Sequence, residues 1–144
     1  MKRYERAFRS LEARGGERTY WELLWPGECI LTKIIVKQVG GDNVAFTIDI
    51  FNARIAVSAS VSSGGGDPEG DYAADPDNYR VCDTIDSESP GKLSKFFDYA
   101  QAEFINQDVL SHTNRKKKIY VEIEPQGSGD KTWDVTLGCE IEVG

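Results

Sequence analysis

The clearest pattern along the chain is a strict alternation of apolar and polar positions over residues 131–143. The apolar positions are the odd ones, Trp133, Val135, Leu137, Cys139, Ile141 and Val143, and polar residues or glycine lie between them. Successive side chains of a β-strand point to opposite faces, so this period of two predicts a strand with one face on a core and the other in water. Gly138, in the middle of the strand, indicates a bulge or a bend.

Three other segments are predicted to be strands with a core face. Residues 29–39 are rich in β-branched residues, and residues 44–50 and 119–124 alternate. In the first segment we expect one face to hold Ile30, Thr32, Ile34 and Val36, and the other to hold Leu31, Lys33, Ile35 and Lys37. The inward positions of the other two segments are Val44, Phe46, Ile48, Ile50, Ile119, Val121 and Ile123. The loops at residues 40–43 and 125–130 have hairpin composition, so we predict that each joins two strands paired side by side.

The rest of the chain carries weaker patterns. Residues 53–61 and 79–85 favour short strands and residues 87–91 a turn, whereas residues 92–108 fit a strand or a helix, with a short helix or an irregular segment favoured. Six or seven strands without β–α–β alternation predict a mostly β fold, an antiparallel two-layer β-sandwich that is jelly-roll-like. Its core should contain the inward residues Ile34, Val36, Phe46, Ile48, Val121, Ile123, Trp133, Val135, Leu137 and Ile141.

The first 18 residues differ from the rest of the chain in charge. They hold six basic and three acidic side chains, a net charge of +3 in a chain whose total is −7, so the remaining residues carry −10. Tyr4, Phe8 and Leu11 follow a helical spacing, and two glycines come soon after them. We therefore predict a short helix over residues 3–13.

This helix divides the chain into a basic N-terminal arm at residues 1–19 and a sandwich domain at residues 20–144. Three interpretations of the arm stay open. Its apolar stripe suits packing on the chain's own sandwich or docking on a neighbouring subunit, and contact with a membrane or nucleic acid is the remaining alternative. The aromatic cluster that follows, with Tyr20, Trp21 and Trp25, suits a core, a subunit contact or stacking on sugar rings. The candidate partner-binding residues are Tyr4, Arg6, Phe8, Arg9, Leu11, Trp21 and Trp25.

Two loops carry concentrated charge. Residues 62–80 are acidic and glycine-rich with little to bury, which predicts a solvated loop. Asp75, Asp77 and Asn78 in this loop could offer oxygen atoms to calcium, but their spacing lacks the pattern of an EF-hand. The basic residues 115–118 precede a predicted strand, where such charge protects against pairing at a sheet edge.

No residue pattern in the chain predicts catalysis, a metal or a cofactor. His112 is the only histidine, and no nucleophile elbow or P-loop occurs. The three cysteines do not have the spacing of a metal site, and we expect Cys139 to be a buried thiol. Asp134 and Glu140 are expected on the solvated face of their strand. A net charge of −7 argues against nucleic-acid or anionic-membrane partners, and no apolar run reaches the length of a transmembrane helix.

Residues 31–38 (LTKIIVKQ) and 44–49 (VAFTID), joined by a glycine turn, together with residues 127–135 (GSGDKTWDV), resemble small structural proteins of tailed bacteriophages, among them capsid decoration (cement) proteins. The resemblance implies a β-sandwich without catalytic residues, located in the virion and assembled in the host cytoplasm. It also implies that the partners are the major capsid protein or other virion subunits, and that the protein is a homo-oligomer in the assembly. The alternatives are a tail or neck position, and a carbohydrate-binding module that uses the aromatic cluster.

Overall fold

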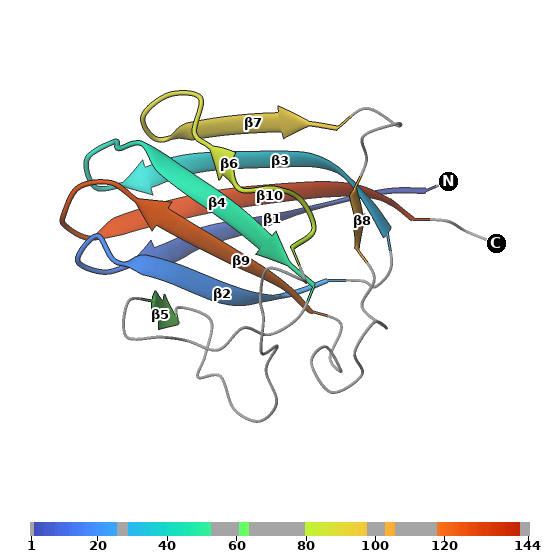
Figure 1. The fold of residues 1–144 in the computed structure, drawn as a ribbon, viewed down its shortest axis with the longest axis horizontal. Helices are drawn as coiled ribbons and strands as arrows, with labels where there is room; N and C mark the ends of the chain where they lie inside the picture. The colour runs from blue at the N-terminus through green and yellow to red at the C-terminus, as the bar shows by residue number, and fades with distance from the viewer. Residues whose placement is uncertain are drawn as a thin grey trace.

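A computed structural model describes residues 2–25, 29–52, 61–63, 80–97, 103–105 and 118–141. The described residues form ten strands and no helix (Figure 1). The order in the first sheet, called sheet A, is β1 (Lys2–Ala13), β10 (Lys131–Ile141), β3 (Cys29–Gly40) and β7 (Lys92–Phe96), and β8 (Glu103–Ile105) also pairs with β3. The order in the second sheet, called sheet B, is β5 (Val61–Ser63), β2 (Arg18–Leu24), β9 (Lys118–Pro125), β4 (Phe46–Phe51) and β6 (Ile85–Asp86).

All paired strands are antiparallel except β2 and β5, which are parallel. The prediction of a mostly β, largely antiparallel fold is therefore confirmed for the described residues. Among these residues, no helical segment offers the length and apolar character that crossing a membrane requires.

The hydrophobic core lies between the two sheets. The ring centroids of Phe46 on β4 and Trp133 on β10 are 4.7 Å apart, so side chains from both sheets meet directly. Nine of the ten predicted core residues are buried in one cluster, namely Ile34, Val36, Phe46, Ile48, Val121, Ile123, Trp133, Val135 and Leu137. The side chain of the tenth, Ile141, lies outside the described residues. The alternation of β10 is confirmed, and Cys139 is buried as predicted.

The two predicted hairpins are wrong. β3 lies in sheet A and β4 in sheet B, and the same separation holds for β9 and β10, so the loops between them cross from one sheet to the other (Figure 1). These crossings pack against one another. Gly15 N, in the turn between β1 and β2, donates a hydrogen bond to Asp130 Oδ1 at 2.9 Å, and a Cβ on Gly41 would lie 2.4 Å from the Asp130 carbonyl oxygen. Glycine is required at Gly41, whose φ is +82°.

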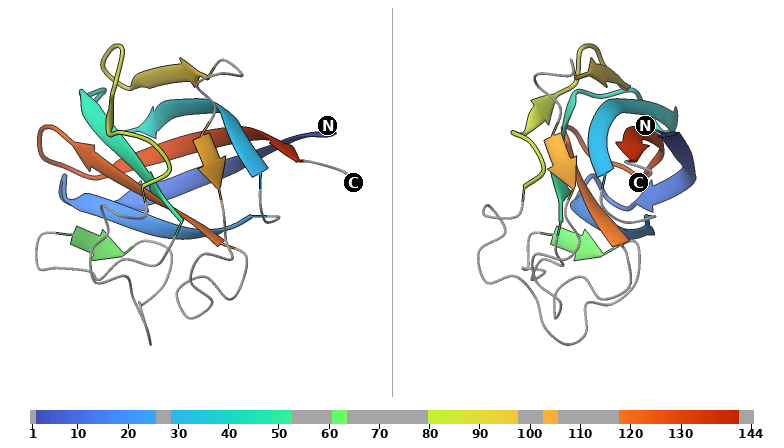
Figure 2. Two further views of the ribbon diagram at one scale, coloured as in Figure 1. Left: turned by 45° about the vertical axis from the view of Figure 1, so that its right-hand side comes forward. Right: turned by 90° about the vertical axis from the view of Figure 1, so that its right-hand side faces the viewer.

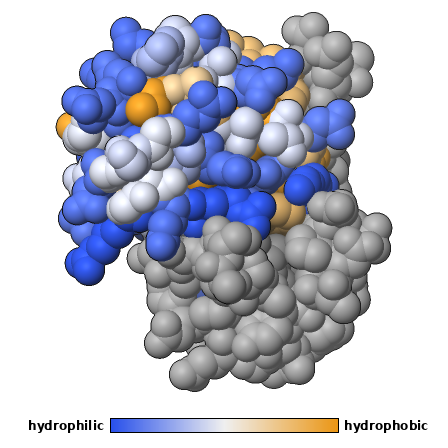
Figure 3. Space-filling view, turned by 60° about the vertical axis from the view of Figure 1, so that its left-hand side comes forward, coloured by the Kyte–Doolittle hydropathy of each residue, from blue (hydrophilic) through white to orange (hydrophobic). Residues whose placement is uncertain are grey.

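Figure 3 shows the molecule turned so that the left-hand side of Figure 1, where these crossings lie, comes forward. The described surface in this view is mostly hydrophilic, and its hydrophobic areas are small and interrupted.

The predicted faces of the first part of β3 are also wrong. Leu31 is fully buried, whereas Ile30 and Thr32 are only partly buried. The reason is a bulge, because Lys33 lies opposite Gly138 and Leu31 lies opposite Cys139, which leaves Thr32 as an extra residue on β3. The register irregularity expected near Gly138 is thus present, although the extra residue belongs to the neighbouring strand.

The predicted helix over residues 3–13 is wrong, because β1 occupies this segment as a strand at the edge of sheet A. The pairing with β10 shifts between Phe8 and Leu11, and Ser10 has a φ of +56°. Before this bulge the even-numbered residues of β1 face inward, and after it the odd-numbered residues do. Tyr4, Phe8 and Leu11 therefore share the core side of a bulged strand while showing the spacing of a helical stripe.

The other segments have mixed outcomes. The short helix or irregular segment favoured within residues 92–108 is wrong for most of the described part, which forms β7 and β8. Of the strand predicted at residues 79–85, the described residues 80–85 are a strand only at Ile85, where β6 begins, and the turn at residues 87–91 is confirmed. Residues 53–60, 64–79 and 106–117 lie outside the described residues, and with them the possible calcium ligands and His112.

Candidate functional site

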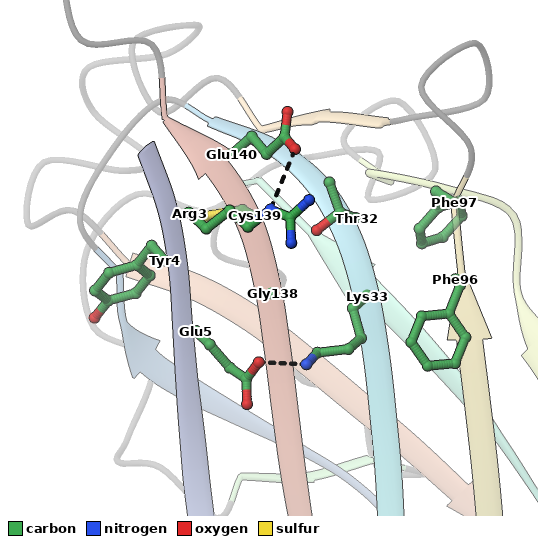
Figure 4. Close-up of a pocket in the computed structure, with 10 residues that line it drawn as sticks. All are labelled: Arg3, Tyr4, Glu5, Thr32, Lys33, Phe96, Phe97, Gly138, Cys139 and Glu140. Carbon is green, nitrogen blue, oxygen red and sulfur yellow. Dashed lines mark hydrogen bonds and ion pairs between the residues drawn. The ribbon is translucent and has the colours of Figure 1, made fainter. Parts of the chain in front are cut away.

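The most distinctive exposed site lies on the face of sheet A that points away from sheet B, called here the outer face of sheet A. A depression of about 540 Å³ crosses four strands of this face. Its lining residues are Arg3, Tyr4, Glu5, Thr32, Lys33, Phe96, Phe97, Gly138, Cys139 and Glu140 (Figure 4). The site therefore combines basic, acidic and aromatic side chains from distant parts of the chain.

Two ion pairs run across the strands of this site. Arg3 Nε lies 3.8 Å from Glu140 Oε1, and the Lys33 ammonium binds the Glu5 carboxylate (Figure 4). The second pair spans β10 at Gly138, which lies opposite both Glu5 and Lys33. Since a glycine has no side chain to separate them, the two charged groups meet above it. The Arg3 side chain is 91% exposed, so its pair contributes only about 0–1 kcal/mol to stability.

Phe96 gives the site an apolar margin. It lies opposite Lys33, and 64% of its surface is exposed, the largest value among the large hydrophobic side chains of the described residues. The neighbouring Phe97 is half-buried against the core and has the Lys95 ammonium 5.6 Å from its ring centroid. An exposed aromatic ring beside compensated charges is typical of a contact surface.

Two of the predicted partner-binding residues, Arg6 and Arg9, lie exposed along β1. The Arg6 guanidinium lies 5.3 Å from the centroid of the Phe8 ring. Arg9 Nη1 is 3.3 Å from Asp134 Oδ2, and the Ser10 N–H donates to Asp134 Oδ1 at 2.9 Å. Asp134 was expected to be simply solvated, but its carboxylate holds the bulge of β1 in place.

The aromatic members of the predicted partner-binding set pack inside this chain. The Trp25 ring contacts Tyr4 edge-on at 5.4 Å and Phe8 at 6.4 Å between centroids, and Leu11 packs against the same core. Trp21 and Trp25 are buried, and Tyr20 is buried as well. Of the open interpretations, packing on the chain's own core is therefore the one that these rings follow. Buried rings do not present a face on which a sugar could stack.

The buried thiols beside Trp25 are linked by hydrogen bonds. The Trp25 Nε1–H donates to Cys29 Sγ at 3.1 Å, and a hydrogen bond with Cys139 lowers the pKa of Cys29. The same bond, together with burial, raises the pKa of Cys139 strongly, so its thiol stays protonated. Cys29, Cys82 and Cys139 form no disulfide bonds with one another. A protonated, buried sulfur is a poor nucleophile.

The face of sheet B that points away from sheet A, called the outer face of sheet B, holds a second group of charges. Glu122 and Asp49 lie opposite each other on β9 and β4, and they are 7% and 8% exposed. Arg18 Nε is 3.6 Å from Glu122, and Arg80 Nη1 is 3.4 Å from Asp49, which also accepts a hydrogen bond from the Thr84 hydroxyl. Burial raises the pKa of Glu122 against an opposing effect of Arg18.

Sequence reasoning missed this buried group. Asp49 was expected on an outward face, and alternation alone cannot show whether an outward face is covered. Tyr20, Phe51 and Tyr120 form a second buried cluster on the same face. The pairing of Asp49 with Arg80 joins residues far apart in sequence, so no local pattern signals it.

The described side chains do not form a recognisable catalytic set. Several of their carboxylates are engaged in ion pairs or hold a turn or a bulge, and no group of three or more described His, Cys, Asp or Glu residues is placed to hold a metal ion. No protein-family model, no curated protein and no solved structure matches the chain.

Proposed function

We propose that the protein is a non-enzymatic structural component of a bacteriophage virion, of the capsid decoration type, that stabilises the head by contacts with its subunits. The observation that carries this proposal is the strand order. In sheet A the order is β1-β10-β3-β7, and in sheet B the order is β2-β9-β4-β6, so that each strand of one order is next in number to the strand at the same place in the other.

We interpret this order as a β-sandwich of the jelly-roll type, with β5 and β8 as additions. In such a fold the first strand pairs with the last and the second strand pairs with the last but one. Successive strands alternate between the sheets except in the middle of the chain, where here β4 and β6 pair within sheet B. Jelly rolls are used by viral capsid proteins and by lectin domains. This architecture and the phage resemblance of the β3, β4 and β10 sequences support the same class of protein.

The proposed mechanism is physical. Each copy would place the outer face of sheet A across a joint between capsid subunits, with Phe96 as the apolar contact and the exposed arginines of β1 against acidic residues of the partner. A stable interface of this kind buries about 1,200–2,000 Å² in total. A protein that binds only the assembled lattice stabilises it by mass action.

Mass spectrometry of gradient-purified virions tests this function. We expect peptides of this chain at a fixed ratio to the major capsid protein, and in the head fraction after heads and tails are separated. Recovery in the tail fraction would move the protein to a tail or neck position. Virions that contain none of the chain would refute the proposal.

The carbohydrate-binding alternative loses its basis, because it relied on Tyr20, Trp21 and Trp25 as stacking platforms and all three are buried. No described observation favours it over the structural role.

A further inference from the structure

The free side of β1 is the feature from which a further interaction follows. Among the described residues only β10 pairs with β1, which forms the margin of sheet A (Figure 2). The backbone N–H and C=O groups on the other side of an edge strand can pair with another strand. β1 is 12 residues long, longer than most strands in globular proteins.

The bulge divides this edge into two parts. Lys2 to Phe8 pair with β10 without a shift in register, whereas the irregularity begins after Phe8. A bulge bends a strand and interrupts the ladder, so it protects the second part of the edge from pairing. A regular stretch of seven residues, 2–8, stays available.

Two neighbouring rows of charged side chains cross the outer face of sheet A and end at this edge with opposite signs. One row runs from Glu140 to Arg3 and ends at the edge with a positive charge. The next row runs from Lys33 over Gly138 to Glu5 and ends with a negative charge. The Arg3 and Glu5 side chains are 91% and 57% exposed, so both are accessible at the margin.

We propose that β1 pairs antiparallel with β1 of a second copy of this chain, about a two-fold axis at Tyr4, so that sheet A continues from one copy into the other. In this register Arg3 of each copy lies opposite Glu5 of the other. Each row then alternates in sign across the dimer, from Lys33 through Glu5 to Arg3 and Glu140 of the second copy. Opposite-charge pairs across strands are stabilising, and like charges are destabilising.

Other registers are less favourable. In a continuous sheet, residues that face each other across the two β1 strands point to the same side of the sheet. The two-fold axis must therefore pass through a residue and not between two residues. An axis at Glu5 places two glutamates opposite each other, and an axis at Arg6 does the same with two arginines. An axis further along β1 brings the bulge into the paired stretch. The register at Tyr4 does place Lys2 opposite Arg6 of the second copy, at the ends of the stretch, which lowers the affinity.

The size of the contact sets its strength. In this register residues 2–6 of each copy pair with one another and form an interface at or below the small end of specific interfaces, about 1,200 Å². We therefore expect a weak dimer in solution that becomes prominent at high concentration, or when a larger assembly holds two copies together. The inference does not depend on the virion role, since a dimer can form whatever particle the protein belongs to.

Sedimentation velocity over a concentration series, with two charge variants and their mixture, tests this dimer. In Arg3→Glu, residues 3 and 5 are both acidic, and in Glu5→Arg both are basic, so each variant should dissociate on the order of tenfold more readily than the wild type. In an equimolar mixture the acidic pair of one variant faces the basic pair of the other. The mixture should therefore regain association near the wild-type level.

The mixture separates the proposed contact from effects within one chain. Each variant also loses an internal ion pair, with Glu140 or with Lys33, and these losses persist in the mixture. Glu12→Arg and Arg14→Glu are matched controls, because both residues are exposed, lie beyond the bulge and undergo the same charge changes. These controls should associate like the wild type, and all variants should retain the wild-type circular dichroism spectrum.

A wild-type protein that stays monomeric at the highest concentration would overturn the inference. So would a mixture that associates no better than its components, or controls that weaken association as much as the test variants. Each of these results leaves the mass-spectrometric test of the virion role unaffected.

Discussion

The outer faces of the two sheets carry similar paired charges but differ in burial. On the outer face of sheet B, Glu122 and Asp49 are almost fully buried beside Arg18 and Arg80. On the outer face of sheet A, Arg3 and Glu5 are exposed and their partners lie across the strands. The energetic consequences should differ accordingly, because a buried charge that loses its partner is destabilising while an exposed pair contributes little. The outer face of sheet B therefore belongs to the structural interior, and that of sheet A is available to partners.

The largest expected effect comes from the core that both sheets share. Trp133→Ala should reduce the free energy of unfolding by about 3–5 kcal/mol, because it leaves a large cavity against Phe46. Urea denaturation followed by fluorescence or circular dichroism measures this change. If Trp133→Ala reduced the free energy of unfolding by less than the outer-face substitutions do, the two sheets would not share one core.

The next largest effect should separate the two outer faces directly. Arg18→Ala removes the cation beside buried Glu122 and should cost about 1–3 kcal/mol, because the carboxylate then lacks that partner. Arg3→Ala is the matched change on sheet A and should stay within about 0.5 kcal/mol of the wild type. Equal losses in the two variants, measured by urea denaturation, would contradict the difference in burial.

The pH dependence of stability sharpens the comparison further. Burial raises the pKa of Glu122 above its ordinary value of 4.5. Between that value and the raised pKa the folded state binds more protons than the unfolded state, so the contribution of Glu122 is fully present below pH 4.5 and is lost as pH rises through the window. Glu122→Gln removes this loss.

Urea denaturation of the wild type and Glu122→Gln at a series of pH values measures the effect. The free energy of unfolding of the variant, minus that of the wild type, should increase with pH across this window. A difference that is independent of pH would show that burial does not control the pKa of the Glu122 carboxyl.

The smallest effect on stability is expected for the exposed ring on sheet A. Phe96→Ser should change the free energy of unfolding by less than about 0.5 kcal/mol, because most of the ring is already in water. If the outer face of sheet A docks on the capsid, the same variant should occupy less of the particle in a co-sedimentation assay. Leu93→Ser on the same strand is the buried control and should be markedly destabilised. Full occupancy by a folded Phe96→Ser protein would remove this ring from the interface.

The sequence by itself determined which residues line most of the core. In β10, β4 and β9 the alternation predicted every described residue that belongs to the hydrophobic core, from Trp133 and Val135 to Phe46 and Ile123. The glycine-rich turns were also located correctly. Both signals are local, because a period of two and a turn composition are properties of a single stretch of chain.

Only the tertiary structure decided which strands pair and which faces are covered. The loops after β3 and β9 have hairpin composition, yet they cross between sheets, since a turn signal reverses the chain without choosing its partner. A single extra residue changes the inward positions from even to odd numbers in β1 and from odd to even numbers in β3. Local periodicity therefore misleads, and at β1 the spacing resembles that of a helix. The burial of Glu122 and Asp49 depends on residues brought together by the fold. Alternation separates the two sides of a strand, but what covers each side depends on contacts between segments distant in sequence.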